Sequence, residues 1–190
     1  FVASANHVPV GSWYPHNLTI GTGGTGHNGR SWRLYELLEA GNSFSVEGFA
    51  QVHRDNINPI ARDLVRLARI LRERGLLSRE ALAFLSRLDE WDGRLTTMSP
   101  EAARAETLLA AVHRSIRPEG ETATLAARFG GGFAGVVFLL RTVLGEYERS
   151  GEIPLMAEVA SWLDQVLRQA AEKTPGRGPV ATRPQRGAYQ

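Results

Sequence analysis

The chain has 190 residues, of which 43% are hydrophobic, and this composition suits one domain with a buried core. Its 22 basic and 20 acidic residues leave a net charge of only +2 and are interspersed along the chain, which argues against the basic stripe of a nucleic-acid-binding protein. Cysteine is absent, which excludes disulfides and thiolate ligands. Because no long uninterrupted apolar run occurs, we expect no membrane-spanning segment.

Residues 1–29 have the only strand and turn character in the chain. Residues 1–5 are apolar enough for a short strand, after which Pro9, Gly11 and Pro15 force an irregular path. A glycine-rich stretch, "GTGGTGHNG", completes this segment. The chain opens on Phe1 without a signal pattern, so we expect it to be a piece of a longer protein.

Residues 30–173 show helical apolar spacing almost throughout. Asn58-Pro59 and Ser99-Pro100 each join a favoured N-cap to a proline at the first helical position. Further helices are predicted from residue 30 to Gly41, from Ser45, from Ser78, over 133–147 and from Pro154. The helix that starts at residue 99 is expected to run through Ile116 to Pro118, and the helix over 133–147, apolar nearly all round, is expected to be buried.

These patterns predict a mainly α fold with a short N-terminal strand and turn segment. We divide the chain into an irregular segment at 1–29, a helical domain at 30–173 and a flexible tail from 174 to 190. The tail, "TPGRGPVATRPQRGAYQ" from Thr174, has no apolar period that would hold it to a core.

The glycine-rich segment contains the spacing G-x-G-x-x-G at Gly21, Gly23 and Gly26. A dinucleotide-binding turn needs a buried strand before it and a second strand after its helix. Here the preceding "HNLTI" is short and follows Pro15, and the acid at a suitable distance, Glu47, falls in a predicted helix. We therefore interpret these glycines as a surface connector and not as a phosphate site.

Histidine spacing does not predict a metal site. His7, His16 and His27 lie in the irregular segment, while His53 and Asp55 are two residues apart near a helix end. Residues two apart on a helix do not face each other, and no H-x-x-x-H pair occurs. The chain also lacks the G-x-S-x-G pattern, so no serine is placed beside a base by motif.

Four motifs follow one another in the first half of the chain. They are "SANHVPVGSWYP", an Arg leading "LYELLEAG", "FSVEGFAQVHRDNINPIARDLV", and "LDEWDG". In order and spacing they resemble the β-subunit of penicillin acylases, which are N-terminal-nucleophile hydrolases. The resemblance covers residues 3–93 and continues more loosely to about residue 173. It implies that the chain is a piece of an αββα hydrolase fold.

The resemblance also implies roles for two residues. Asn6 stands where the family has the asparagine that donates to the oxyanion of the tetrahedral intermediate, and Arg30 matches an arginine near the catalytic centre. Read without the resemblance, Asn6 is a turn or strand-end residue. Arg30 is equally a salt-bridge partner at a helix start, because a cation at that end opposes the helix dipole.

The resemblance implies a nucleophilic serine outside this chain, whose own α-amine acts as base. The intact protein would then hydrolyse acyl amides, such as β-lactam side chains or acyl-homoserine lactones, whereas this chain alone would be inactive. Its expected partners are the α-subunit and the nucleophile-bearing part of the β-subunit, with no nucleic acid or membrane. The alternative is a non-catalytic helical interaction module derived from the family.

The sequence differs from the family pattern at several positions, and one of these differences concerns calcium binding. His7 replaces a second asparagine, and the glycine-rich stretch replaces one that commonly contains Trp. Some members bind structural calcium through an acid where this chain has Asn17 or Leu18, so calcium is not expected here. The family needs no organic cofactor, and its members are typically exported, which implies a periplasmic or secreted protein.

Overall fold

The computed structural model of the protein describes residues 29–41 and 44–174. In these ranges the backbone forms eight α-helices and two 3-10 helices, and its extended pairing is one isolated antiparallel bridge between Ile57 and Arg94. The elements are α1 (Gly29–Glu39), α2 (Val46–Arg54), α3 (Pro59–Glu73), α4 (Arg79–Leu85), η1 (Ser86–Leu88), α5 (Pro100–Val112), η2 (Gly120–Thr122), α6 (Ala123–Phe129), α7 (Gly132–Ser150) and α8 (Met156–Lys173).

The predicted mainly α fold class is confirmed for these residues. The strand expected in residues 1–5 and nearly all of the expected tail at 174–190 lie outside the described residues, and the αββα frame and the three domain boundaries stay predictions.

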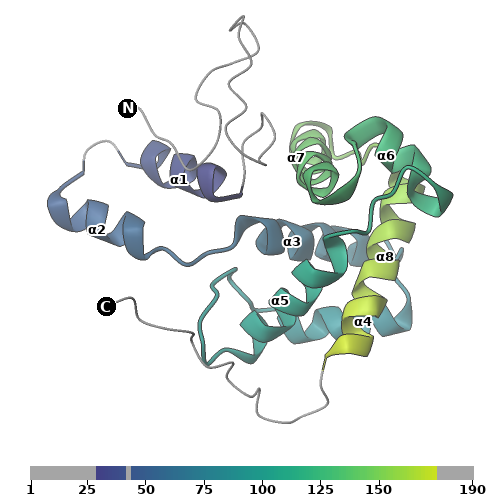
Figure 1. Ribbon diagram of the computed structural model, residues 1–190, viewed down its shortest axis with the longest axis horizontal. Helices are drawn as coiled ribbons and strands as arrows, with labels where there is room; N and C mark the ends of the chain where they lie inside the picture. Colours follow the sequence, from purple (N-terminus) through teal and green to yellow (C-terminus); the bar gives the residue numbers. More distant parts are fainter. Residues whose placement is uncertain (1–28, 42–43, 175–190) are drawn as a thin grey trace, which may run out of the picture.

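Helix α3 is the centre of the hydrophobic core. Nine of its residues are buried, and it packs against α1, α4, α5 and α7 (Figure 1). Helix α8 closes the opposite side of the core by packing on α4, α5 and α6. The largest fully buried side chains come from these elements and the turns between them: Leu64, Leu67, Leu71, Leu85, Leu88, Leu108, Ile116, Leu125, Leu139, Leu140, Trp162 and Leu163.

Four helices begin where capping chemistry predicts. The side chains of Ser45, Asn58, Ser78 and Ser99 each accept a hydrogen bond from a backbone N–H in the first turn of the helix that follows. These bonds satisfy donors that have no partner within the helix, which is why such residues favour helix starts. The predicted caps are therefore confirmed at all four positions.

The region after α5 differs from the prediction. The helix ends at Val112, and Ile116 lies beyond it, where its side chain is 1% exposed and its carbonyl accepts from the Gly132 N–H at 2.8 Å. Thr122 holds the same turn, because its hydroxyl accepts from the Arg117 N–H at 2.9 Å. The apolar residue that suggested a further helical turn instead enters the core from a loop.

Helix α6 was not predicted. It has 7 residues and buries only Leu125 and Phe129, so its apolar spacing is too short to establish a period. The start of α8 was also predicted slightly early. Leu155 adopts a left-handed conformation with φ of 52°, and the helix begins after it at Met156.

Helix α7 is buried on one face and open on the other. Val136, Leu139 and Val143 are fully buried, whereas Phe138 is 54% exposed. The expectation of a buried helix is therefore correct for one face. Taken singly, none of the described helices is long and apolar enough to cross a membrane; η2–α6 and α7 meet that test only jointly, across a bend of 66°.

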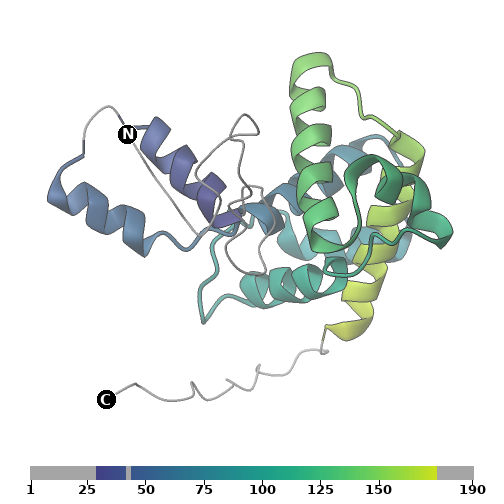
Figure 2. The same cartoon turned by 45° about the horizontal axis from the view of Figure 1, so that its top comes forward.

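Helices α1 and α2 lie together at one end of the molecule (Figures 1 and 2). Helix α2 is the outermost element there in both views and has no buried residue. Helix α1 lies between α2 and the core and buries only Ser31, Trp32 and Leu38. This end of the molecule carries the candidate site.

Candidate functional site

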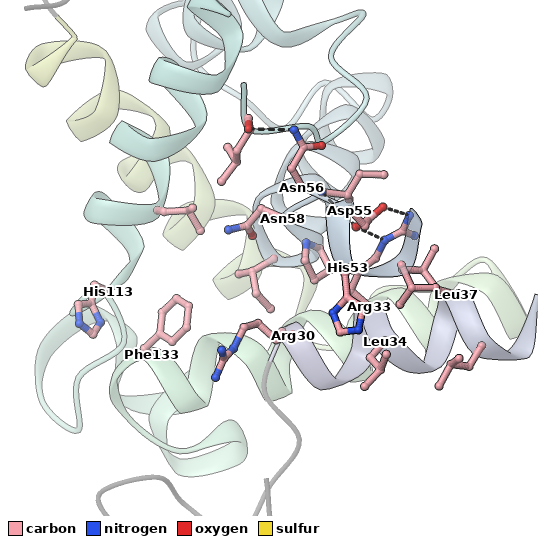
Figure 3. A pocket seen from close by; sticks show the side chains of 18 of the residues that line it. Arg30, Arg33, Leu34, Leu37, His53, Asp55, Asn56, Asn58, His113 and Phe133 are labelled. Carbon is pink, nitrogen blue, oxygen red and sulfur yellow. Dashed lines mark hydrogen bonds and ion pairs between the residues drawn. The ribbon is translucent and has the colours of Figure 1, made fainter. Parts of the chain in front are cut away.

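A cavity of 1240 Å³ opens between α1, α2, the 55–60 segment and the ends of α5 and α7. Most of its wall is apolar and includes Leu34, Leu37, Phe49, Val52, Ile57, Leu95, Leu109 and Phe133. Its polar groups come from Arg30, Arg33, His53, Asp55, Asn56, Asn58 and His113 (Figure 3). An apolar hollow with a few polar side chains is the usual form of a small-molecule site.

Arg30 occupies the first turn of α1 and lines this cavity. Its side chain extends toward Phe133 and His113 (Figure 3). The rings of these two residues pack edge to face, with their centres 5.3 Å apart. The structure thus places the predicted arginine on a cavity, while its predicted catalytic role stays a prediction. Asn6, the other predicted site residue, lies outside the described residues.

Arg33, one helical turn after Arg30, forms a bidentate pair with Asp55. Its Nε donates to Asp55 Oδ1 at 2.9 Å and its Nη2 donates to Oδ2 at 2.8 Å (Figure 3). Only 10% of the Asp55 side chain and 19% of the Arg33 side chain are exposed, so water screens this pair weakly. The pair ties α1 to the segment that connects α2 and α3.

A second fork ties α1 to α3 itself. Arg62 donates from Nη1 and Nη2 to the two carboxylate oxygens of Glu36, at 3.0 and 2.8 Å. Arg33 Nη1 also donates to Glu36 at 3.0 Å, and Arg62 Nε donates to Asp63 at 3.1 Å. The five side chains therefore form one continuous network, which we call the arginine-fork network: Arg33, Glu36, Asp55, Arg62 and Asp63.

The pKa values of the three acids in the network are shifted in two directions, down by the neighbouring guanidinium groups and up by burial. Hydrogen bonds from Arg62, followed by those from Arg33, lower the pKa of Glu36, and the Arg33 guanidinium lowers the pKa of Asp55. Burial raises the pKa of Asp63 despite the adjacent Arg62. Glu36 and Asp55 are thus held ionised, as a fork with a guanidinium requires.

The "WDG" motif contacts the segment that carries Asp55, and so it bears on the arginine-fork network. The Gly93 carbonyl accepts from the Asn58 N–H at 2.9 Å, and the Leu95 N–H donates to the Asn56 carbonyl at 2.9 Å, so the motif pairs with the 55–58 segment. Gly93 has φ of +96°, and a Cβ there would lie 3.2 Å from side-chain carbons of Arg62 and Ile57. Glycine is therefore the residue that this close turn accommodates.

Trp91 and Asp92 shape the same turn. The Trp91 indole Nε1 donates to the Arg94 carbonyl at 2.9 Å, and the Arg94 N–H donates to Asp92 Oδ1, also at 2.9 Å. The motif is a structural brace for the segment that carries Asp55.

Trp32 provides the apolar attachment of α1. Its ring is 9% exposed, and the Arg141 guanidinium of α7 stacks over it at 3.8 Å from the ring centre. Such stacking combines packing with a cation–π attraction. Gly29 adds a close approach, because a Cβ there would lie 3.1 Å from Ile60 of α3.

Metal ligation finds no support in the described part of the chain, where no group of three or more His, Asp or Glu side chains could hold an ion. Asp55, whose spacing from His53 did not predict a metal site, forms its fork with Arg33. The glycine-rich motif at Gly21, Gly23 and Gly26 lies outside the described residues, as do His7, His16, His27, Asn17 and Leu18.

Sequence reasoning did not identify the arginine-fork network. Arg33 and Asp55 are 22 positions apart, and Arg62 and Glu36 are 26 apart, so no local pattern joins them. One signal was present, because Asp55 is the final residue of the "FAQVHRD" stretch on which the resemblance rests. The repeat of Arg at 30 and 33, one helical turn apart, was the other.

Comparison with known proteins agrees with the motifs. The family model for penicillin amidase matches residues 1–185, whereas no curated protein and no solved structure gives a match. The matched range includes Asn6, Arg30, the arginine-fork network and the "WDG" brace. The chain therefore belongs to the penicillin amidase family.

Proposed function

We propose that this chain is part of an acylase that hydrolyses acyl amides with an N-terminal serine nucleophile supplied outside these 190 residues. The observation that carries this proposal is the family match, which spans residues 1–185. The cavity at Arg30 adds support, because it offers an apolar wall beside a cation at the position that the family resemblance assigns to the catalytic centre.

The proposed chemistry divides between this chain and the rest of the enzyme. The serine, activated by its own α-amine, attacks the amide carbonyl and forms a tetrahedral intermediate whose oxygen is negatively charged. Asn6 donates its side-chain N–H to that oxygen. A single fixed donor of this kind contributes about 10²–10³ in rate.

Arg30 provides positive charge beside the reacting groups. Its guanidinium lies at the start of α1 and reaches into the cavity. We propose that it holds Asn6, the environment of the α-amine or a substrate carboxylate. The planar fork of its donors matches the two oxygens of a carboxylate, and a single N–H of it can donate to the side-chain oxygen of Asn6.

The apolar side chains of the cavity line the pocket for the acyl group. Leu34 and Leu37 of α1 face the same cavity as Phe133 of α7, so a hydrocarbon or aromatic acyl chain would lose water on both sides. Substrates in this proposal are β-lactams with an acyl side chain or acyl-homoserine lactones. The enzyme needs no organic cofactor, is exported, and completes its site with the α-subunit and the nucleophile-bearing part of the β-subunit.

The test uses the full-length protein and a set of acyl amides that differ in chain length. Hydrolysis of at least one by the wild type is expected, and Asn6→Ala should lower kcat by about 10²–10³. Self-cleavage products serve as the control that the variant folds. Asn6→Gln, which keeps the amide but moves it outward by one methylene, should also lose activity.

Full activity in Asn6→Ala would contradict the oxyanion assignment. If the wild-type protein hydrolyses no acyl amide, whether or not it cleaves itself, the proposed acylase function is wrong. The alternative of a helical interaction module would then stand.

A further inference from the structure

Helix α1 has little apolar attachment for an element that carries a candidate catalytic residue. Its three buried residues are Ser31, Trp32 and Leu38, and its other cavity-facing side chains are only partly covered. Burial of so small an apolar surface holds a helix weakly. The position and rotation of α1 on the core therefore depend on its polar contacts as well as on this apolar packing.

Two of those contacts are the arginine forks, and their geometry is directional. Two parallel hydrogen bonds between a guanidinium and a carboxylate fix both distance and angle, which a single ion pair does not. The Arg33–Asp55 fork ties α1 to the segment that follows α2, and the Glu36–Arg62 fork, one helical turn further along α1, ties it to α3. Together they fix the rotation of the helix about its own axis.

Asp55 is the more firmly supported end of its fork. Its Oδ1 also accepts from the Ile57 N–H at 3.2 Å, and the 55–58 segment is paired with the "WDG" brace through the Asn58 N–H and the Gly93 carbonyl. The carboxylate is thus fixed to α3 and its surroundings. Arg33, by contrast, belongs to α1, the helix whose position on the core the fork determines.

Arg30 and Arg33 lie one turn apart, and both line the cavity. Whatever fixes the Arg33 side chain also fixes the backbone from which Arg30 reaches into the cavity. We propose that Asp55 is a positioning residue, which holds α1 through the Arg33 fork and so places Arg30 for amide hydrolysis. This inference rests on the proposed function for its catalytic consequence.

Asp55→Asn in the full-length protein is the principal test. The variant keeps the side-chain volume but replaces one acceptor oxygen with a donor, so the fork loses one bond and its charge assistance. We expect kcat to fall by about tenfold to 100-fold, since small misplacements of catalytic groups have effects of this size, with a smaller change in KM. Arg33→Lys is the second variant and should act alike, because an ammonium cannot form the fork.

A double-mutant cycle with Arg30→Ala separates positioning from general stability. If Asp55 acts through Arg30, then Asp55→Asn should have little further effect on kcat once Arg30 is removed. An equal fold-loss in both backgrounds would overturn the inference. Glu148→Gln is the matched control, because it breaks the 2.7 Å pair between Arg66 and Glu148, which joins α3 to α7 away from α1, and should leave kcat unchanged.

Hydrogen exchange tests the positioning directly. Asp55→Asn should speed exchange in α1 and leave α8 unaffected, whereas Glu148→Gln should leave α1 unchanged. Unchanged exchange in α1 would overturn the inference even if kcat falls. A wild type that hydrolyses no acyl amide overturns the proposed function and the catalytic part of this inference, and exchange in α1 then decides whether Asp55 holds the helix.

Discussion

Helices α3 and α1 are in contact but are stabilised by different forces. Helix α3 buries nine residues, among them Leu64, Leu67 and Leu71, each at 0% exposure. Helix α1 buries three and depends on charged side chains that are 10% to 34% exposed. The core is thus held by non-directional burial, and the site end is held by directional hydrogen bonds.

This difference separates stability from placement. Removing a core side chain should lower the stability of the whole helical body, because the surrounding apolar contacts are shared. Removing a fork should change where α1 lies while the body stays folded. The following predictions test that separation, beginning with the largest expected change in stability.

Trp162→Ala should cause the largest loss of stability. The Trp162 side chain is 2% exposed, and its Nε1 donates to Ser115 Oγ at 2.8 Å, so the variant leaves a cavity and removes one of the two hydrogen bonds of a hydroxyl that still donates to the Val112 carbonyl. The expected loss is about 3–5 kcal/mol in the free energy of unfolding. Chemical denaturation measures it, with Phe138→Ala, at a 54% exposed position, as the control that should lose far less. Equal losses would contradict the described core.

Gly135→Ala and Gly145→Ala form a matched pair within α7. A Cβ on Gly135 would lie 1.9 Å from the Gly130 carbonyl oxygen, so the backbone must shift, and we expect a loss of about 1–3 kcal/mol. A Cβ on Gly145 meets nothing within 4 Å, so alanine should stabilise the helix by about 0.5–1 kcal/mol. Opposite signs in denaturation midpoints are expected. A Gly135→Ala variant that loses no stability would contradict the tight α6–α7 turn, and a loss in Gly145→Ala would contradict the open position of that glycine.

Asn58→Ala removes the cap at the junction of the two regions. The Asn58 Oδ1 accepts from the Ala61 N–H at 3.0 Å, and the expected loss is about 1 kcal/mol. Because the backbone N–H of residue 58 still reaches Gly93, hydrogen exchange should rise in the first turn of α3 more than in α1. An equal rise in both helices would show that the two regions unfold as one.

Acid should release α1 before it unfolds the core. The folded-state pKa values of Glu36 and Asp55 are lower than their ordinary values of 4.5 and 3.8, so their stabilisation is complete above those values and is lost as the pH falls through the lower folded-state values. Asp63 acts in the opposite sense, because burial raises its pKa and protonation removes the cost of burying its charge.

Hydrogen exchange in α1, corrected for the intrinsic rate, should therefore rise below about pH 4 while α8 stays protected. Glu36→Gln should remove part of this pH dependence. A simultaneous loss of protection in α1 and α8 would contradict separate stabilisation of the two regions.

The sequence predicted most of what local chemistry determines. Ser45, Asn58, Ser78 and Ser99 start their helices because cap and first turn are neighbours in the chain. The structure of the residues after α5 was harder to predict from the sequence. Ile116 is buried by tertiary packing of a loop and does not continue the apolar face of a helix. Local patterns cannot show such burial.

The candidate site was predictable only in part. Arg30 was found through a resemblance, and the structure places it on the cavity. The partners that hold α1 were missed because Arg33 and Asp55 are 22 positions apart and meet only through the tertiary fold. A charged residue on a helix surface has the same sequence signature whether it faces water or a distant carboxylate.

The "WDG" brace has a consequence for the order of folding. It joins the α2–α3 connection to a turn that follows η1, so this contact closes a loop that contains α3, α4 and η1. Closure of so long a loop is entropically slow unless the core has already brought its ends near each other. We therefore expect the helical body to form first and the site end to dock onto it late.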